Sequence, residues 1–240
     1  MKLIINADDF GLSKSISDGI IEGIKDGCIT STSVMANMDS AEYAIKEAIN
    51  NNIDCIGLHI NFTIGKPIIN NKNLVDDNGV FLYNRIQIEN HKLTYEDAYN
   101  EIIAQINKVV EYSNGLIKID HLDIHHHLSD NENIKNAVID IANEYNIPIR
   151  NEFECDALKP DILYTEFTIK NVSIEVLEKL VIKYKDDDIT IELMTHPGYV
   201  DDYTKDITSY IERKKELLVL KEAKEKGIFD KLELINFKQL

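Results

Sequence analysis

The chain begins with MKLIINADDFGLS (residues 1–13), a stretch in which an apolar run ends in two adjacent acids. The run at 3–7, LIINA, is rich in the β-branched residue isoleucine and is typical of a buried strand. Asp8 and Asp9 follow it directly. Two like charges side by side repel each other, so a strand that ends in this way needs a partner for at least one of them.

Outward from this stretch, apolar runs alternate with segments whose apolar residues recur at helical spacing. This alternation predicts β–α units and a parallel sheet. The expected strands cover residues 3–7, 30–37, 55–62, 119–127, 147–152, 161–167, 189–199 (strand plus loop) and 232–237. The expected helices cover residues 15–27, 40–50, 95–112, 132–145, 174–185 and 204–226. We therefore expect one α/β domain over residues 1–240, with about seven parallel strands.

Residues 64–93 interrupt this rhythm with a stretch rich in Asn, Gly and charge. A long irregular connection in a compact domain usually has a function, so we expect an excursion that serves specificity or a dimer contact. Either a closed (β/α) barrel or an open doubly wound sheet would give the remaining order of elements. Neither a GxGxxG nor a Walker loop follows the first strand, so the nucleotide-binding version of the open sheet lacks its phosphate-binding motif.

Composition narrows the classes of partner. Acids outnumber bases 42 to 26, for a formal charge of −16, which opposes binding to nucleic acid and suits a neutral ligand or a bound cation. No stretch approaches the roughly 18 uncharged apolar residues of a membrane span, and the N-terminus has no signal-peptide core. The three cysteines form no CxxC pair, which is typical of reduced thiols. We expect a soluble cytoplasmic protein that binds neither nucleic acid nor membrane.

Polar side chains occur where strand after strand ends. They are Asp8, Asp9, Asn37, His59, Asn61, Asp123, His125, His126, His127, Arg150, Glu192, Thr195 and His196. In a parallel β/α architecture the carboxyl ends of all strands lie on one face, where active sites are built. Residues more than 120 positions apart in the chain are therefore expected to converge on one pocket.

One Asp and two His from different strand ends have the stoichiometry of a catalytic zinc site, which keeps a further position for water. Alternation along a strand would place His125 and His127 on one side, with Asp123 on that side to orient His125. A divalent ion would also neutralise one acid of the Asp8–Asp9 pair and leave the other free as a base.

Each feature alone has a structural explanation. Paired acids often form a turn or a helix cap, a strand histidine such as His59 is often a core residue, and a histidine run can be a solvated strand end. Pro197 and Gly198 suit a turn. Together, at the strand ends of one α/β domain, the features favour a metal site.

Four motifs resemble the YdjC-like carbohydrate deacetylases, also called the chitooligosaccharide deacetylase family. They are NADDFGLS at 6–13, GLHINFT at 57–63, DIHHH at 123–127 and MTHPGY at 194–199, in matching order across nearly the whole chain. The resemblance implies a distorted (β/α) barrel related to the polysaccharide deacetylases. It also implies hydrolysis of an N-acetyl group on a small amino sugar or chitooligosaccharide, with one divalent metal ion, Mg²⁺ or Zn²⁺.

The resemblance further implies roles for single residues. Asp9, His59 and His125 would bind the metal, Asp8 would be the general base, and His196 the general acid. Arg150 follows a short strand where the wider superfamily has an arginine that orients the base. The other candidates for substrate binding or for support of the site are Asn37, Asp123, His127, Glu192 and Tyr199.

Two other functions compete with this prediction. A metal-dependent phosphoesterase or amidohydrolase on another substrate usually needs more His and Asp ligands and, for phosphate, a basic pocket, whereas basic residues near these motifs are scarce. A non-catalytic sugar-binding module would need a broken motif set, and this set is intact. The expected partner is a small carbohydrate, and since barrels of this kind often pair, a homodimer is also expected.

Overall fold

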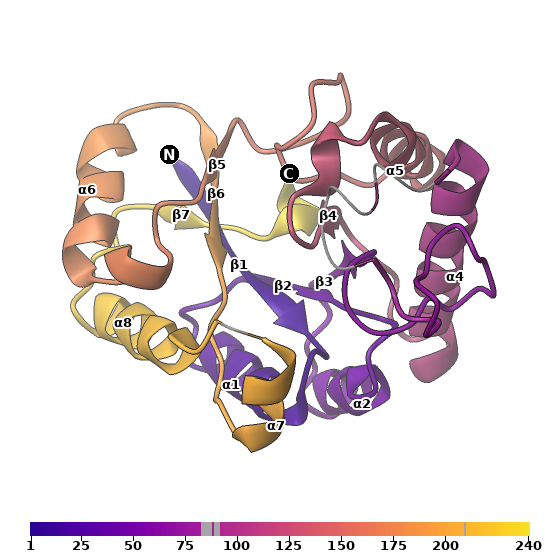
Figure 1. The fold of residues 1–240 in the computed structure, drawn as a ribbon. Helices are drawn as coiled ribbons and strands as arrows, with labels where there is room; N and C mark the ends of the chain where they lie inside the picture. The colour runs from indigo at the N-terminus through magenta and orange to yellow at the C-terminus, as the bar shows by residue number, and fades with distance from the viewer. Residues whose placement is uncertain (83–87, 89–91, 209) are drawn as a thin grey trace.

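The computed structural model describes residues 1–82, 88, 92–208 and 210–240 (Figure 1). Seven strands form one sheet, and every pairing between them is parallel. They are β1 (Lys2–Phe10), β2 (Ser31–Val34), β3 (Ile56–Ile60), β4 (Leu122–Ile124), β5 (Ile162–Tyr164), β6 (Thr190–Thr195) and β7 (Glu233–Leu234). The order is β4-β3-β2-β1-β6-β5, and β7 pairs with the first residues of β1.

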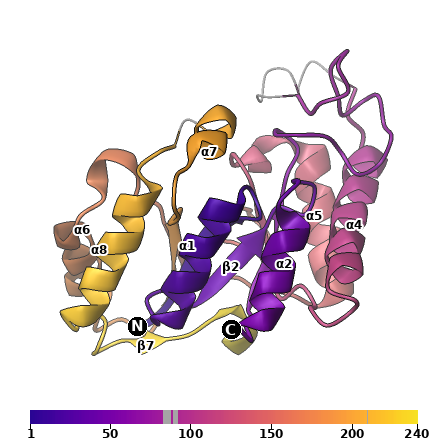
Figure 2. The same ribbon diagram turned by 90° about the horizontal axis from the view of Figure 1, so that it is seen from below.

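The helices wrap around the outside of this curved sheet (Figures 1 and 2). They are α1 (Lys14–Lys25), α2 (Ala41–Asn50), α4 (Tyr95–Tyr112), α5 (Glu132–Tyr145), α6 (Ile174–Tyr184), α7 (Asp202–Ile207) and α8 (Arg213–Glu225). Three 3₁₀ turns complete the elements: Leu128–Asp130, Ile169–Asn171 and Phe237–Gln239. Neighbours touch in the order α6, α8, α1, α2, α4, α5, which follows the order of the strands beneath them.

The central strand β1 shows that the two faces of the sheet differ. The convex face, beneath the helices, is apolar, and the concave face is polar. Leu3, Ile5 and Ala7 belong to the main hydrophobic core beneath the helices. Successive side chains of a strand alternate between faces, so Asn6 and Asp8 point inward. There they are fully buried and hydrogen-bond to each other and to polar groups of other strands. The interior of the sheet therefore carries charge on its C-terminal half.

The predicted α/β fold, a distorted parallel barrel, is confirmed, and the sheet is a half-barrel. Within the described ranges no ladder joins β4 to β5. The strand predicted at 147–152 is wrong: Ile149 makes one isolated bridge to Leu122 and then hydrogen-bonds to Leu158. The single helix predicted at 204–226 is also wrong, because Thr208 adopts an extended conformation that ends α7 before α8 begins.

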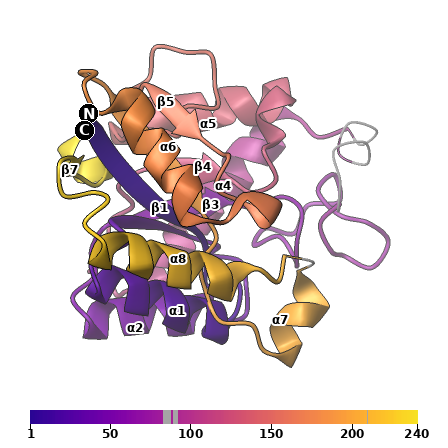
Figure 3. The same ribbon diagram turned by 90° about the vertical axis from the view of Figure 1, so that its left-hand side faces the viewer.

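The two ends of the molecule differ in content (Figures 2 and 3). Both chain termini lie at the end where the strands begin, and α7 lies at the opposite end with the segment after β3. Of the predicted excursion at 64–93, residues 83–87 and 89–91 are outside the described residues. Residues 64–82 of this segment are irregular and are anchored by Glu101, whose carboxylate accepts the backbone N–H groups of Ile68 and Ile69. Among the helices described, none has the length and apolar character needed to cross a bilayer.

Candidate active site

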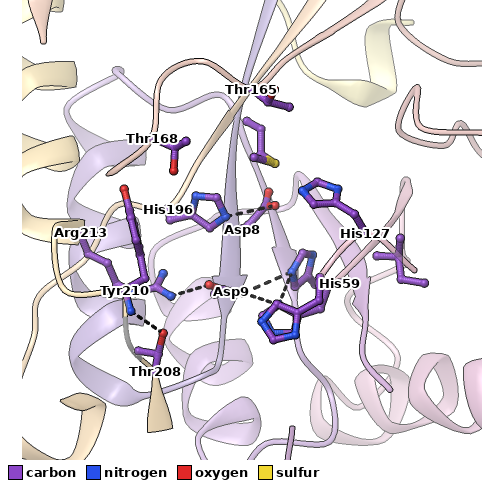
Figure 4. A pocket seen from close by; sticks show the side chains of 14 residues that line it. Asp8, Asp9, His59, His127, Thr165, Thr168, His196, Thr208, Tyr210 and Arg213 are labelled. Atoms are coloured by element: carbon purple, nitrogen blue, oxygen red, sulfur yellow. Dashed lines mark hydrogen bonds and ion pairs between the residues drawn. The ribbon is translucent and has the colours of Figure 1, made fainter. Parts of the chain in front are cut away.

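A cavity of about 420 Å³ opens where the strands end, lined by side chains from five of the seven strands or the loops that follow them (Figure 4). Most of the predicted residues meet there. Asp8 and Asp9 come from β1, His59 from β3, His125 follows β4, and His196 follows β6. The predicted convergence of distant strand ends is therefore present in the structure.

Asp9, His59 and His125, here called the ion triad, form a compact triangle of ligand atoms. Asp9 Oδ1 lies 3.2 Å from His59 Nε2 and 3.1 Å from His125 Nδ1, and these two nitrogens are 3.1 Å apart. A zinc ion takes His nitrogens and carboxylate oxygens at about 2.0–2.2 Å, which a single point above this triangle satisfies. Asp9 Oδ1 is buried and accepts no hydrogen bond from the residues described. The donor set therefore fits one divalent cation.

The backbone of β1 explains how two adjacent acids avoid each other. The pairing of β1 with β2 shifts register between Ala7 and Phe10, and Asp9 has a φ of +68°. Only a few per cent of residues other than glycine adopt this left-handed region, with Asp and Asn enriched there. The turn directs the two carboxylates toward different partners. Asp8 contacts Arg150, and Asp9 Oδ2 accepts a 2.6 Å hydrogen bond from Arg213.

Asp123 supports His59, which corrects the prediction that it would orient His125. His59 and Asp123 are register partners on the adjacent strands β3 and β4, and Asp123 Oδ1 lies 2.7 Å from His59 Nδ1. Side chains of register partners on adjacent strands lie close together, so Asp123 reaches His59. His125 lies beyond the end of β4 and has no such position beside Asp123. An ion that binds at Nε2 displaces the proton there, while the proton on Nδ1 stays with Asp123, as is usual for histidine ligands of metals.

The charges of this cluster compensate one another. Burial raises the pKa of Asp9, but Arg213 and His125 outweigh it and hold that pKa well below its usual value. Burial lowers the pKa of His59, but Asp123 and Asp9 outweigh it and hold that pKa well above its usual range. Burial likewise raises the pKa of Asp123, and Arg150 and His59 reverse the shift. The carboxylates that face the triad are thus ionised at neutral pH.

Arg150, the arginine predicted beside the base, forms an ion pair with Asp8. Its two terminal nitrogens donate to the two Asp8 oxygens at 2.6 and 2.8 Å, and its Nε donates to Glu192 at 2.8 Å. Burial raises the pKa of Asp8, but Arg150 outweighs it and leaves that pKa lowered. The pKa of Glu192 is raised to about 7, chiefly by burial. Asp8 is therefore an ionised carboxylate held in a fixed orientation.

His196 lies beside Asp8, with its Nε2 3.9 Å from Asp8 Oδ2. The loop that carries His196 is anchored to α8, because Glu216 accepts the His196 backbone N–H at 2.5 Å. A Cβ on Gly19 would lie 2.7 Å from the Gly198 Cα, so this close approach of α1 to the loop requires glycine at position 19. Burial lowers the pKa of His196 to about 4, although Asp8 acts to raise it. The imidazole is neutral at pH 7.

Two predicted residues, Asn37 and Tyr199, do not line the cavity, and a third, His127, lines it with an unexpected backbone conformation. Asn37 donates to the Ile64 and Lys66 carbonyls and so fixes the start of the excursion. The Tyr199 hydroxyl donates to Glu22, away from the cavity. His127 lines the cavity, but its φ of +50° breaks the strand alternation used to place it beside His125, and its Nδ1 lies 3.1 Å from Glu152.

Sequence reasoning missed the first turn of α8. Arg213 and Glu216 lie three positions apart on the buried face of that helix, and one holds Asp9 while the other holds the His196 loop. Tyr210 lines the cavity and donates its hydroxyl to Glu216. No motif marks these residues. The one available signal was two charged residues on the helix face that also carries Leu217 and Leu220.

A second group of possible ligands overlaps the first. Atoms of Asp8, His59 and Asp123 also lie within 4.8 Å of one another. Arg150 Nη2 is 2.6 Å from Asp8 and 3.0 Å from Asp123, so a guanidinium already neutralises this group. The ion triad is the better cation site.

The half-barrel fold is also found in a solved carbohydrate esterase. A family 4 acetyl xylan esterase from Clostridium thermocellum, in complex with a cobalt ion, superposes with a TM-score of 0.51 at 11% identity, over 100% of this chain and 89% of the esterase chain. This likeness concerns the fold.

The chain belongs to the YdjC-like family, whose model matches residues 2–231. A carbohydrate deacetylase of Clostridium beijerinckii is 37% identical over the full length of both chains. A solved structure from Enterococcus faecalis V583, described as a candidate cellobiose-phosphate cleavage protein, has a TM-score of 0.89 at 28% identity and covers 99% of this chain and 98% of its own. The family predicted from the motifs is confirmed.

Proposed function

We propose that this protein is a metal-dependent hydrolase that removes the N-acetyl group from a small N-acetylated amino sugar or chitooligosaccharide. The carrying observation is the ion triad beside a second carboxylate, Asp8, that has its own arginine. Membership in a family with curated carbohydrate deacetylases supports the substrate class.

Asp9, His59 and His125 would hold the ion. When bound there, a divalent cation lowers the pKa of a water from near 16 to about 7 and polarises the acetyl carbonyl. Two imidazoles and one carboxylate favour Zn²⁺ or a similar transition metal, since Mg²⁺ prefers oxygen ligands. The triad thus supports zinc over magnesium.

Asp8 has the properties of the general base. It is ionised and lines the cavity. Its plane is fixed by Arg150, a residue that is not one of the three proposed metal ligands. Removal of the proton of the attacking water by such a group typically contributes about 10²–10⁴ in rate. The two acids of the opening stretch would divide the work: Asp9 binds the ion and Asp8 takes the proton.

His196 would deliver a proton to the departing amine. Because its pKa is about 4, it carries no proton of its own at pH 7 and must receive one during the reaction. Asp8 lies 3.9 Å from His196 Nε2 and, as the general base, would hold the proton taken from the water. If Asp8 and His196 move closer during turnover, the proton would pass from Asp8 through His196 to the leaving nitrogen. The C–N bond would then break as the amine forms.

The cavity suits a small, uncharged and hydroxyl-rich substrate. Thr165, Thr168 and Thr208 line it, and their hydroxyls can donate to and accept from sugar hydroxyls. A volume of about 420 Å³ is within the usual range for small-molecule sites.

Acetate release tests the proposal. The ion-free protein is loaded with one equivalent of Zn²⁺ and given N-acetylglucosamine and its β-1,4-linked dimer and trimer. We expect acetate from at least one of them, and none after chelation. Sugar binding without acetate release by the loaded protein would instead favour a binding module, and release of phosphate from sugar phosphates would favour a phosphoesterase.

A further inference from the structure

Arg213 lines the cavity and contacts the ion triad through Asp9 without belonging to the triad. It is the first residue of α8 and is 2% exposed. Its Nη2 donates to Asp9 Oδ2 at 2.6 Å, and its guanidinium lies over the Tyr210 ring at 5.3 Å (Figure 4). Two contacts therefore fix the plane of this guanidinium.

Most of the hydrogen-bonding capacity of Arg213 is unused. Its Nε and Nη1 are buried and find no acceptor among the residues described. Buried polar groups are nearly always paired, so donors left free in the wall of a cavity indicate a missing acceptor. Because Arg213 lines the cavity, a ligand bound in the cavity can supply this acceptor.

We infer that Arg213 donates these N–H groups to the acyl oxygen of the substrate, and to the carboxylate of the released acid. The inference rests on the proposed deacetylase function. The geometry of Asp9 supports this inference. Its Oδ1 lies beside the nitrogens of His59 and His125, while its Oδ2 accepts the hydrogen bond from Arg213. The Asp9 carboxylate therefore separates the guanidinium from the point where a bound ion would polarise the acyl oxygen.

Asp8 and His196 would serve the proton transfers of the reaction, whereas Arg213 would act on the acyl oxygen. They are within 3.9 Å of each other, and Asp8 is held by Arg150, so each acid of the opening pair has its own arginine. Charge grows on the acyl oxygen as water attacks. A donor fixed beforehand in a buried site stabilises that charge without reorganising, which is the usual basis of an oxyanion hole. Arg213 thus adds a charged donor to the acyl side.

The test compares Arg213→Lys and Arg213→Gln with the matched control Lys214→Met, which changes the exposed neighbour on the same helix turn. Lysine keeps the charge and can pair with Asp9, but it cannot hold Asp9 and present a planar fork to substrate as well. Zinc content is measured first, and kcat is expressed per bound zinc.

We expect both Arg213 variants to lose about 10²–10³ in kcat per bound zinc with KM nearly unchanged, the size found for loss of one oxyanion donor. The inhibition constant of acetate, and its affinity for the zinc-loaded protein by NMR titration, should weaken at least about tenfold. Lys214→Met should match the parent in all three measurements.

Parent-like kcat per bound zinc, or unchanged acetate affinity, in both Arg213 variants would overturn the inference. A loss of activity fully explained by lost zinc would also overturn it, because Arg213 would then act only through Asp9. A parent protein that releases no acetate would instead refute the proposed function, so the two failures are distinct.

Discussion

Replacing Asp123 with Asn tests whether His59 is prepared as a ligand by its neighbour. Asp123 Oδ2 receives hydrogen bonds from Ser33 at 2.7 Å and Asn6 at 3.2 Å, and it lies 3.0 Å from Arg150 Nη2. Those three groups are donors, so an asparagine must turn its oxygen toward them. Its NH₂ group would then face His59 Nδ1.

That arrangement forces the proton of His59 onto Nε2, the atom that faces the ion triad. A protonated nitrogen cannot bind a cation, so the ligand is lost unless the ring turns or the site rearranges. Loss of such a supporting partner typically costs about 10–100-fold in metal affinity. At about 1.4 kcal/mol per tenfold, this corresponds to about 1.4–2.8 kcal/mol.

The assay is calorimetric titration of the ion-free protein with Zn²⁺, with folding checked by circular dichroism. The chain offers a matched control in Asp120→Asn, because Asp120 and His121 form a second buried pair at 2.6 Å outside the cavity. Asp120→Asn should bind Zn²⁺ like the parent. A folded Asp123→Asn protein with parent-like affinity would refute the claim that Asp123 sets the His59 tautomer.

Further predictions concern the acids and one ligand. Asp8→Asn should keep its zinc and lose about 10²–10⁴ in turnover, and an active, zinc-loaded variant would remove Asp8 as the base. Asp9→Asn and His125→Ala should each lose zinc in emission spectroscopy, and unchanged metal content in both would disprove the triad. The pKa of Glu192 is raised from 4.5 to about 7, so its contribution to stability is complete below pH 4.5 and is lost as pH rises through 7. Glu192→Gln should flatten this part of the decline in urea unfolding of the ion-free protein, and an unchanged slope would count against the raised pKa.

Much of the fold was predictable because the elements are local. The apolar runs at 3–7 and 55–62 and the helical spacing at 95–112 mark buried strands and an amphipathic helix without reference to the rest of the chain. The segment at 147–152 looked like a strand for the same reason. Its backbone instead divides its hydrogen bonds between Leu122 and Leu158, which only tertiary packing decides.

The site residues at strand ends could be predicted from the sequence, whereas the site residues on a helix could not. Asp9, His59 and His125 follow apolar runs, and parallel topology brings such positions together. Arg213 lies in a segment that reads as an ordinary charged helix, and its role depends on α8 packing against α1. The left-handed backbone of His127 likewise cannot be read from a run of three histidines.

Anomalous diffraction from a zinc-soaked crystal tests the central division of labour between the two acids most directly. The account predicts one peak bonded to Asp9 Oδ1, His59 Nε2 and His125 Nδ1, with Asp8 still paired to Arg150. A peak bonded instead to Asp8 and Asp123, with Arg150 displaced, would contradict it.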